Sequence, residues 1–222
     1  MNISDNIKSY LHEIGQRRCK LVAISKTKPV EIIQEAYDAG QRVFGENRVQ
    51  ELTEKYDKLP SDVEWHMVGH LQTNKVKYIA PFVDMIHSVD SFKLMKEIDK
   101  QAAKNNRTIS CLLQVHIAEE ETKFGLTEEE LFSLLDEVGK AGFKHIRIAG
   151  LMGMATYTTD QDQVRREFAF LKGLLDRAAV QYHNQVIDLR ELSIGMSGDY
   201  KIALEEGSTM IRIGTGVFGA RG

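Results

Sequence analysis

The chain has 222 residues, of which 42% are hydrophobic and 27% charged, and its formal net charge is −3. This composition is typical of a globular protein and excludes a disordered chain. The slightly acidic balance also argues against non-specific binding to nucleic acid or to an anionic membrane, because both need concentrated positive charge.

The sequence shows no secretory signal, membrane span or metal-binding motif. The N-terminal segment lacks an apolar core, and the uncharged stretch Ile148–Thr159 is too short to cross a bilayer. Cys19 and Cys111 lie in or beside apolar runs, so we expect both to be buried, reduced thiols. His66 and His70 are four residues apart without the glutamate of a zinc-protease motif, which favours packing or loop histidines. We therefore expect a cytoplasmic protein.

The predicted elements begin with a helix at Ile3–Ile14, after which strands and helices alternate. The predicted strands are short apolar runs at Lys20–Ser25, Arg42–Gly45, Glu64–Gly69, Asp84–Ser88, Ile109–Ile117, Ile146–Leu151, Glu191–Ile194 and Thr209–Gly214. The predicted helices between them are Val30–Ala39, Asp90–Lys104, Thr127–Gly142, Val164–Ala179 and Asp199–Glu206. The helix from Thr127 opens with the capping-box pattern T-E-E-E.

Several predicted strands are apolar at consecutive positions, which is typical of a parallel sheet covered on both faces. Eight strands are the number that closes a parallel barrel, so the sequence predicts an α/β fold with one (β/α)8 barrel of the TIM type across residues 1–222. The additional N-terminal helix would cover the gap left where the chain ends soon after the eighth strand. An open doubly wound sheet is the alternative. No long apolar surface stripe remains, so we expect a monomer.

Lys26 is the first candidate site residue, because chemistry in a parallel barrel lies at the C-terminal ends of the strands. It follows the first strand on the face shared by Val22 and Ile24. Loss of water beside apolar walls would prepare its amine for Schiff-base chemistry. The alternative is an ordinary loop lysine that extends into water.

Arg212 is the second candidate and lies on the eighth predicted strand. If Ile211 and Ile213 pack outward against helices, Arg212 points into the barrel, where its guanidinium needs an acceptor. The alternative is an internal ion pair with a carboxylate from another strand.

The third candidate is a pair of loops after the seventh and eighth strands. They contain Ser197-Gly198 and Gly214-Thr215-Gly216. Barrels often bind phosphate at this place, through backbone N–H groups that glycine leaves accessible and through hydroxyl groups. The alternative is that each glycine forms a tight turn.

These three features converge, because the first and eighth strands are neighbours in a closed barrel. A Schiff-base lysine, a phosphate site and a facing arginine fit pyridoxal phosphate (PLP). Lys26 would form the internal aldimine, the loops would hold the phosphate and Arg212 would face the pyridine nitrogen.

The sequence also resembles the PLP homeostasis proteins, whose barrel is related to the N-terminal domain of alanine racemase. The matching segments are LVAISKTKP (21–29), FGENRVQE (44–51), WHMVGHLQTNK (65–75), HSVDS (87–91), GLM (150–152) and LSIGMSGDYKIALEEGSTMIRIGTGVFG (192–219). The resemblance implies cofactor contacts by Lys26, Asn47, Ser197, Gly198, Arg212, Gly214, Thr215 and Gly216. One departure is the loop Gly153-Met154-Ala155, which in the family commonly carries a proline.

The resemblance implies a protein that buffers or delivers PLP, with PLP-requiring apo-enzymes as possible recipients, and not a strong catalyst. Alanine racemase adds a C-terminal β domain to its barrel, and we expect no such domain here. An arginine at the pyridine nitrogen also disfavours ring protonation and weakens the electron sink. Two alternatives remain: a PLP-dependent amino-acid racemase or lyase, and a cofactor-free Schiff-base aldolase that uses the same lysine and phosphate site.

Overall fold

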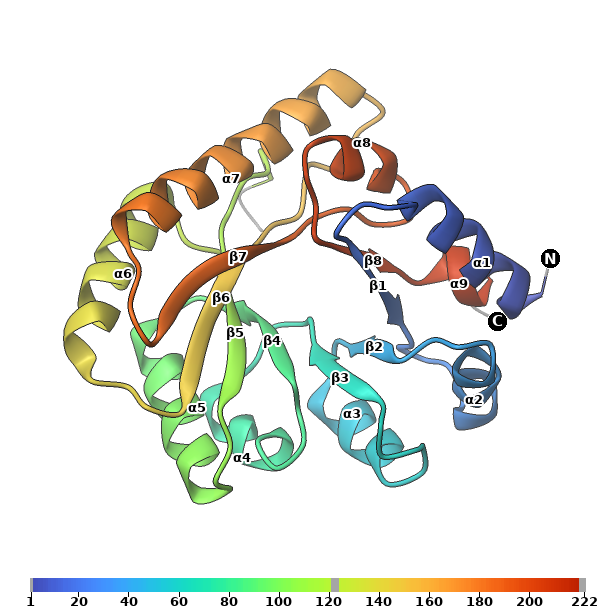
Figure 1. Ribbon diagram of the computed structural model, residues 1–222, viewed down its shortest axis with the longest axis horizontal. Coiled ribbons are helices and arrows are strands. Elements are labelled where there is room, and N and C mark those ends of the chain that lie inside the picture. Colours follow the sequence, from blue (N-terminus) through green and yellow to red (C-terminus); the bar gives the residue numbers. More distant parts are fainter. Residues whose placement is uncertain (1, 121–123, 220–222) are drawn as a thin grey trace.

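The computed structural model describes residues 2–120 and 124–219, and its centre is a closed parallel barrel (Figure 1). The strands pair in chain order, and β1 closes the barrel against β8. The strands are β1 (Lys20–Ile24), β2 (Val43–Glu46), β3 (Glu64–Met67), β4 (Met85–Val89), β5 (Ile109–Gln114), β6 (Ile146–Met152), β7 (Ile187–Ser193) and β8 (Met210–Ile213). The predicted (β/α)8 barrel is confirmed, and the open sheet is wrong.

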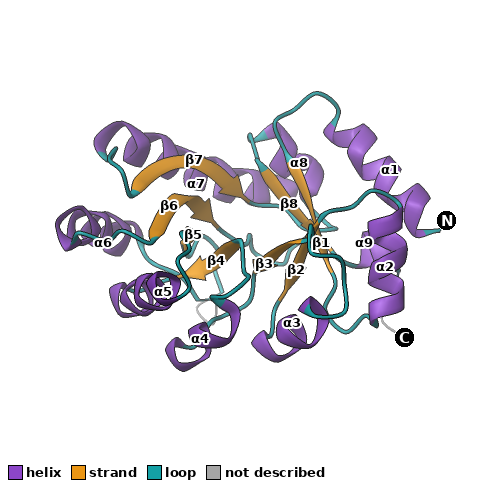
Figure 2. Ribbon diagram, turned by 60° about the horizontal axis from the view of Figure 1, so that its bottom comes forward, coloured by secondary structure: helices purple, strands orange, loops and turns teal. Residues whose placement is uncertain are grey.

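Helices surround the barrel on its outer face, as Figure 2 shows from a tilted view. They are α1 (Ile3–Ile14), α2 (Val30–Asp38), α3 (Val49–Tyr56), the 3-10 turn η1 (Thr73–Lys75), α4 (Val76–Ile79), α5 (Phe92–Lys104), α6 (Glu128–Ala141), α7 (Gln161–Gln181), α8 (Tyr200–Glu205) and α9 (Thr215–Phe218). None of the helices in the described part of the chain is both long and apolar enough to cross a bilayer.

Two hydrophobic layers follow from the alternation of side chains along the strands. A small cluster made of strand residues fills the barrel interior and consists of Val22, Val43, Leu112, Ala149, Met152 and Met210. The larger cluster lies between strands and helices and includes the neighbours of these positions, such as Leu21, Ala23 and Ile211. Since successive side chains point to opposite faces of a strand, this pattern places Ile24 and Arg212 on the inner face.

The helix termini show how the local sequence limits each element. The predicted capping box is present: Thr127 Oγ1 accepts from Glu130 N, and Glu130 Oε2 accepts from Thr127 N. The Asn2 side chain caps α1 in a similar way, accepting from Asp5 N at 2.8 Å. Helix α1 packs beside the short helix α9. This contact brings the first and last helices together next to β1 and β8 (Figures 1 and 2).

Some expected boundaries and burials are wrong. The seventh strand begins at Ile187 and not at Glu191. The polar residues Asp188 and Arg190 interrupt the apolar run in the sequence, but Ile187 and Leu189 are buried. Helices α3, α4 and α9 were missed because they are short, with eight, four and four residues. Cys111 is buried as expected, whereas Cys19 is partly exposed because it precedes β1 at the end of the barrel.

Candidate functional site

A cavity of about 510 Å³ opens at the C-terminal end of the barrel. Its walls come from the ends of β1, β2, β3, β5, β6, β7 and β8 and the loops after them. Among the expected site residues, the lining contains Lys26, Asn47, Ser197, Gly198, Arg212, Gly214 and Thr215. The barrel thus brings together side chains that are up to 189 residues apart, Lys26 and Thr215.

The segment that carries Lys26 is held on both sides by charged groups. On one side the Lys55 ammonium, which is 9% exposed, donates to Ser25 O at 2.9 Å and to Glu46 Oε1 at 2.6 Å. On the other side Thr27 N donates to Glu51 Oε2 at 2.8 Å. Thr27 has φ of 64°, a left-handed conformation that costs energy for a β-branched residue and needs such support. Lys26 itself is half-buried at the cavity wall.

The pKa values of Glu46 and Glu51 shift in opposite directions. Burial raises the pKa of the Glu46 carboxyl, and hydrogen bonds from Lys55 and Ser25 offset this only in part. Burial would also raise the pKa of Glu51, but the Thr27 N–H and the Lys55 ammonium lower it overall. The sequence analysis missed this cluster. The one signal was a glutamate at the end of an apolar strand, with a Glu-Lys pair four residues apart on the next helix.

Asn47 follows β2 and has an unsatisfied polar atom. Its Oδ1 is buried and finds no hydrogen-bond partner among the described residues. Gly69 packs directly on its backbone, since a Cβ at Gly69 would stand 2.7 Å from Asn47 Cα. A buried acceptor of this kind costs free energy unless something binds it, so Asn47 is a candidate ligand contact.

The loops after β7 and β8 bring two hydroxyl groups together. Thr215 Oγ1 lies 3.4 Å from Ser197 Oγ. A Cβ at Gly198 would meet nothing within 4 Å among the described residues, so no protein contact requires glycine there. Gly216 is different. It is not among the described cavity residues, and a Cβ there would overlap the Tyr10 hydroxyl of α1. Its glycine therefore serves the packing of α1 against α9.

Arg212 reaches the cavity from inside the barrel and is 5% exposed. Its NH1 donates to Ser193 O at 2.7 Å and to Ser193 Oγ at 2.6 Å, and its NH2 donates to Gly153 O at 2.9 Å. These acceptors are carbonyl and hydroxyl oxygens, not the carboxylate of the alternative interpretation. Burial lowers the pKa of Arg212 to about 10, so the guanidinium stays charged at neutral pH.

The loop after β6, Gly153-Met154-Ala155, is packed closely. A Cβ at Gly153 would lie 2.6 Å from Leu171 Cδ2 and 2.8 Å from Ile117 Cδ1. The next residue, Met154, lines the cavity. Gly153 therefore brings its carbonyl to Arg212 and directs the following side chain into the site.

The cavity rim includes side chains that the sequence analysis did not single out as site residues. His70 stacks on Phe124, with ring centroids 4.6 Å apart, and its Nδ1 lies 3.8 Å from Asp90 Oδ2. Tyr157 and Met196 are exposed at the same mouth. The described residues hold no cluster of three metal-ligating side chains, so His70 lies at the rim without enough neighbouring ligands, among these residues, to bind a metal.

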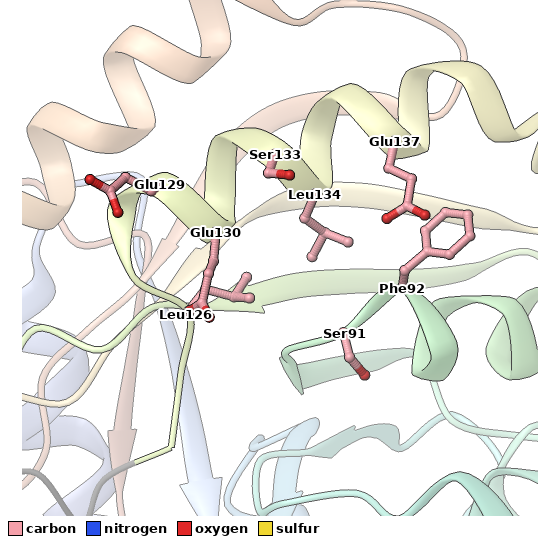
Figure 3. A pocket seen from close by; sticks show the side chains of 8 residues that line it. All are labelled: Ser91, Phe92, Leu126, Glu129, Glu130, Ser133, Leu134 and Glu137. Carbon is pink, nitrogen blue, oxygen red and sulfur yellow. The ribbon is translucent and has the colours of Figure 1, made fainter.

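A second hollow, of about 410 Å³, lies outside the barrel between α5 and α6. Figure 3 shows the side chains that line it: Ser91, Phe92, Leu126, Glu129, Glu130, Ser133, Leu134 and Glu137. Glu130 already serves the capping box, and the described residues that line the hollow include no lysine or arginine. Its acidic lining does not suit a phosphorylated ligand, so the barrel cavity is the candidate site.

Comparison with known proteins identifies the fold and the family of the chain. The family model described as alanine racemase, N-terminal domain, matches residues 1–222. The alanine racemase of Streptomyces lavendulae shares the fold, with a TM-score of 0.79 at 15% identity over 99% of this chain and 57% of the racemase chain. The fold and the cavity therefore define an alanine-racemase-type barrel.

Similarity to proteins of the same length is higher. The pyridoxal phosphate homeostasis protein of Aquifex aeolicus is 43% identical over 208 residues, which cover 93% of this chain and 89% of that protein. The protein of the same name from Vibrio alginolyticus is 38% identical, covering 99% and 98%. The structure of PipY from Synechococcus elongatus with PLP bound has a TM-score of 0.89 at 35% identity and covers 98% of this chain and 100% of PipY. The chain belongs to the pyridoxal phosphate homeostasis protein family.

Proposed function

We propose that this protein binds PLP as a Schiff base on Lys26 and takes part in PLP homeostasis by holding and delivering the cofactor, without strong catalysis of its own. One observation carries the proposal. A single cavity is lined by the amine of Lys26, the hydroxyl groups of Ser197 and Thr215 and the buried guanidinium of Arg212, which are groups that suit an aldehyde, a phosphate and a pyridine nitrogen. PipY, a relative at 35% identity, was solved with PLP bound, which supports the choice of cofactor.

Lys26 and the two hydroxyl groups suit two parts of the cofactor, its aldehyde and its phosphate. Lys26 offers its Nζ at the cavity wall, on a segment held by the Lys55 and Glu51 contacts. Ser197 Oγ and Thr215 Oγ1 are close enough to bind oxygens of one phosphate group, next to the open backbone at Gly198. When bound, PLP supplies an aldehyde that exchanges between amines and a ring that can accept electrons.

Two features favour a carrier over a catalyst. Arg212 presents a permanent cation to the ring, which disfavours a proton on the pyridine nitrogen and weakens the electron sink. The cavity mouth is also bordered by exposed side chains, such as Tyr157 at 98% exposure, which suits exchange of the cofactor with PLP-requiring apo-enzymes. Strong catalysis needs a closed site that excludes water, and water at the open mouth would oppose it.

The test compares PLP with pyridoxal, which lacks the phosphate, by equilibrium binding. We expect the wild-type protein to prefer PLP strongly, and the double variant Ser197→Ala/Thr215→Val to lose most of that preference while binding pyridoxal as before. Ser133→Ala in the outer hollow is the matched control and should behave as wild type. Equal binding of PLP and pyridoxal by the wild-type protein would refute the phosphate site.

Delivery needs a separate experiment. PLP-loaded protein is mixed with an excess of an apo-aminotransferase, and aminotransferase activity is followed over time. We expect activity to appear, and we expect the loaded protein alone to turn over no amino acid at a significant rate. Robust turnover by the loaded protein alone would contradict the carrier and favour a racemase or lyase.

A further inference from the structure

A chain of four polar side chains crosses the barrel interior beneath the cavity. Arg212 NH1 lies 2.6 Å from Ser193 Oγ, His87 Nδ1 lies 2.9 Å from the same oxygen, and His87 Nε2 lies 2.9 Å from His66 Nδ1. All four residues are at most 5% exposed. They come from β8, β7, β4 and β3, and of the four only Arg212 has a role in the proposed PLP site.

The direction of every hydrogen bond in this chain follows from Arg212. A guanidinium can only donate, so Ser193 Oγ accepts from it. Ser193 Oγ could also accept a second hydrogen bond from His87, but its own hydroxyl hydrogen would then have no acceptor among the described residues. The arrangement that leaves no buried hydrogen unpaired therefore has the hydroxyl donating to His87 Nδ1. A neutral imidazole that accepts at Nδ1 carries its hydrogen on Nε2, and this hydrogen points at His66 Nδ1. His66 therefore also carries its hydrogen on Nε2.

The chain requires both histidines to be neutral. Burial lowers the pKa of His66 to about 3, with a smaller contribution from the Lys20 cation. Burial also lowers the pKa of His87 well below its usual value, and His66 and the Arg212 cation lower it further. A protonated His87 would direct an N–H at Ser193 Oγ, and the hydroxyl hydrogen would then lose its acceptor.

The chain leaves part of the guanidinium available to a ligand. Three of the five N–H groups of Arg212 are used by Ser193 O, Ser193 Oγ and Gly153 O. The side chain lines the cavity, so the other two N–H groups can serve what binds there. The orientation of these two groups depends on where the first three are held.

We infer that Ser193, His87 and His66 are positioning residues that form a one-directional hydrogen-bond chain and fix the Arg212 guanidinium toward the ring of the bound cofactor. This inference rests on the proposed function for the identity of the cofactor. The direction of the chain does not depend on the cofactor and can be tested on the protein alone.

The first test is ¹⁵N NMR of the histidine side chains in the protein without added PLP at pH 7. We expect the His66 and His87 signals to show a hydrogen on Nε2 and none on Nδ1, with assignment from the loss of one signal set in His66→Gln and in His87→Asn. A hydrogen on Nδ1 of His87, or a protonated imidazole at either position, would overturn the inference.

The second test measures positioning through PLP retention and the visible spectrum of the bound cofactor. His87→Asn keeps an acceptor near the Nδ1 position, whereas His87→Leu keeps the volume and removes the acceptor. We expect His87→Leu to raise the PLP dissociation constant about tenfold and to shift the spectrum, and His87→Asn to remain near wild type in both, since a hydrogen bond in a charged network is worth about this factor.

A purely structural role predicts another pattern, in which both variants lose stability equally and neither changes the spectrum. That result would overturn the inference. If His87→Leu does not fold, Ser193→Ala removes the same link while keeping the carbonyl bond to Arg212, and wild-type PLP binding by this variant would count equally against positioning. If the wild-type protein takes up no PLP, the proposed function fails, and the NMR result still decides the direction of the chain.

Discussion

Lys55→Met should show how strongly the lysine-bearing segment depends on a buried ion pair. Lys55 Nζ lies 2.6 Å from Glu46 Oε1, and the two side chains are 9% and 0% exposed. Methionine fills the space of the lysine stem, but among the described side chains it leaves the Glu46 carboxylate with only the Ser25 hydroxyl, at 2.6 Å, as a hydrogen-bond donor. Removing one partner of a buried pair costs about 3–5 kcal/mol, so we expect a loss of that size in the free energy of unfolding at pH 7.

The loss should depend on pH with a definite sign. Burial already raises the pKa of Glu46 in the folded state, and Lys55→Met should raise it further. Well below the unfolded pKa of roughly 4.3 the carboxyl is neutral in both the folded and the unfolded state, and the penalty for burying its charge disappears. As pH rises through the folded pKa the carboxyl must ionise inside the protein, so the deficit should be largest at pH 7–8 and shrink toward pH 5.

Urea unfolding followed by the fluorescence of the buried Trp65 measures this at each pH. Lys58→Met on the exposed side of the same region is the control and should stay within about 0.5 kcal/mol of wild type. Glu46→Gln combined with Lys55→Met should recover part of the loss. A Lys55→Met deficit below about 1 kcal/mol at pH 7, or one that is equal at all pH values, would refute the reasoning.

Three further predictions follow from packing and burial. Gly216→Ala should cost about 1–3 kcal/mol in thermal unfolding because its Cβ overlaps Tyr10, and Tyr10→Ala in the same chain should not add its full cost; strict additivity would contradict the overlap. Gly69→Ala should displace Asn47 and weaken PLP binding as well as stability, and unchanged PLP binding would show that Asn47 makes no contact with the cofactor. Burial raises the pKa of the Cys19 thiol to about 11, so native protein at pH 7.5 should react with a disulfide reagent far more slowly than a free thiol, and labelling at the free-thiol rate would rule this out.

The barrel could be predicted because its main signals are local. Buried parallel strands give consecutive apolar residues, and the capping box at Thr127 marks a helix start whatever lies around it. The cavity residues at strand ends, such as Lys26 and Arg212, could be predicted for a related reason. Once eight strands are expected, the fold itself places their C-terminal ends together.

The interactions that support these residues could not be predicted in the same way. Lys55 looks like a surface residue of a polar helix, and only the packing of that helix against β2 buries it beside Glu46. His66, His87 and Ser193 are isolated polar residues in separate apolar strands, and their contact depends on the register of the closed barrel. The contact between Gly216 and Tyr10 could not be predicted either, because the two residues are near opposite ends of the sequence.

The most direct test of the central claim is the visible spectrum of the protein with PLP, before and after borohydride reduction, with peptide mapping of the reduced adduct. We predict a yellow Schiff-base band that reduction bleaches, and a pyridoxyl group that maps to Lys26. Lys26→Ala should lose both, and Lys28→Ala, a lysine on the same segment outside the described cavity lining, should keep both. A protein that stays colourless with PLP, or an adduct that maps to another lysine, would contradict the account.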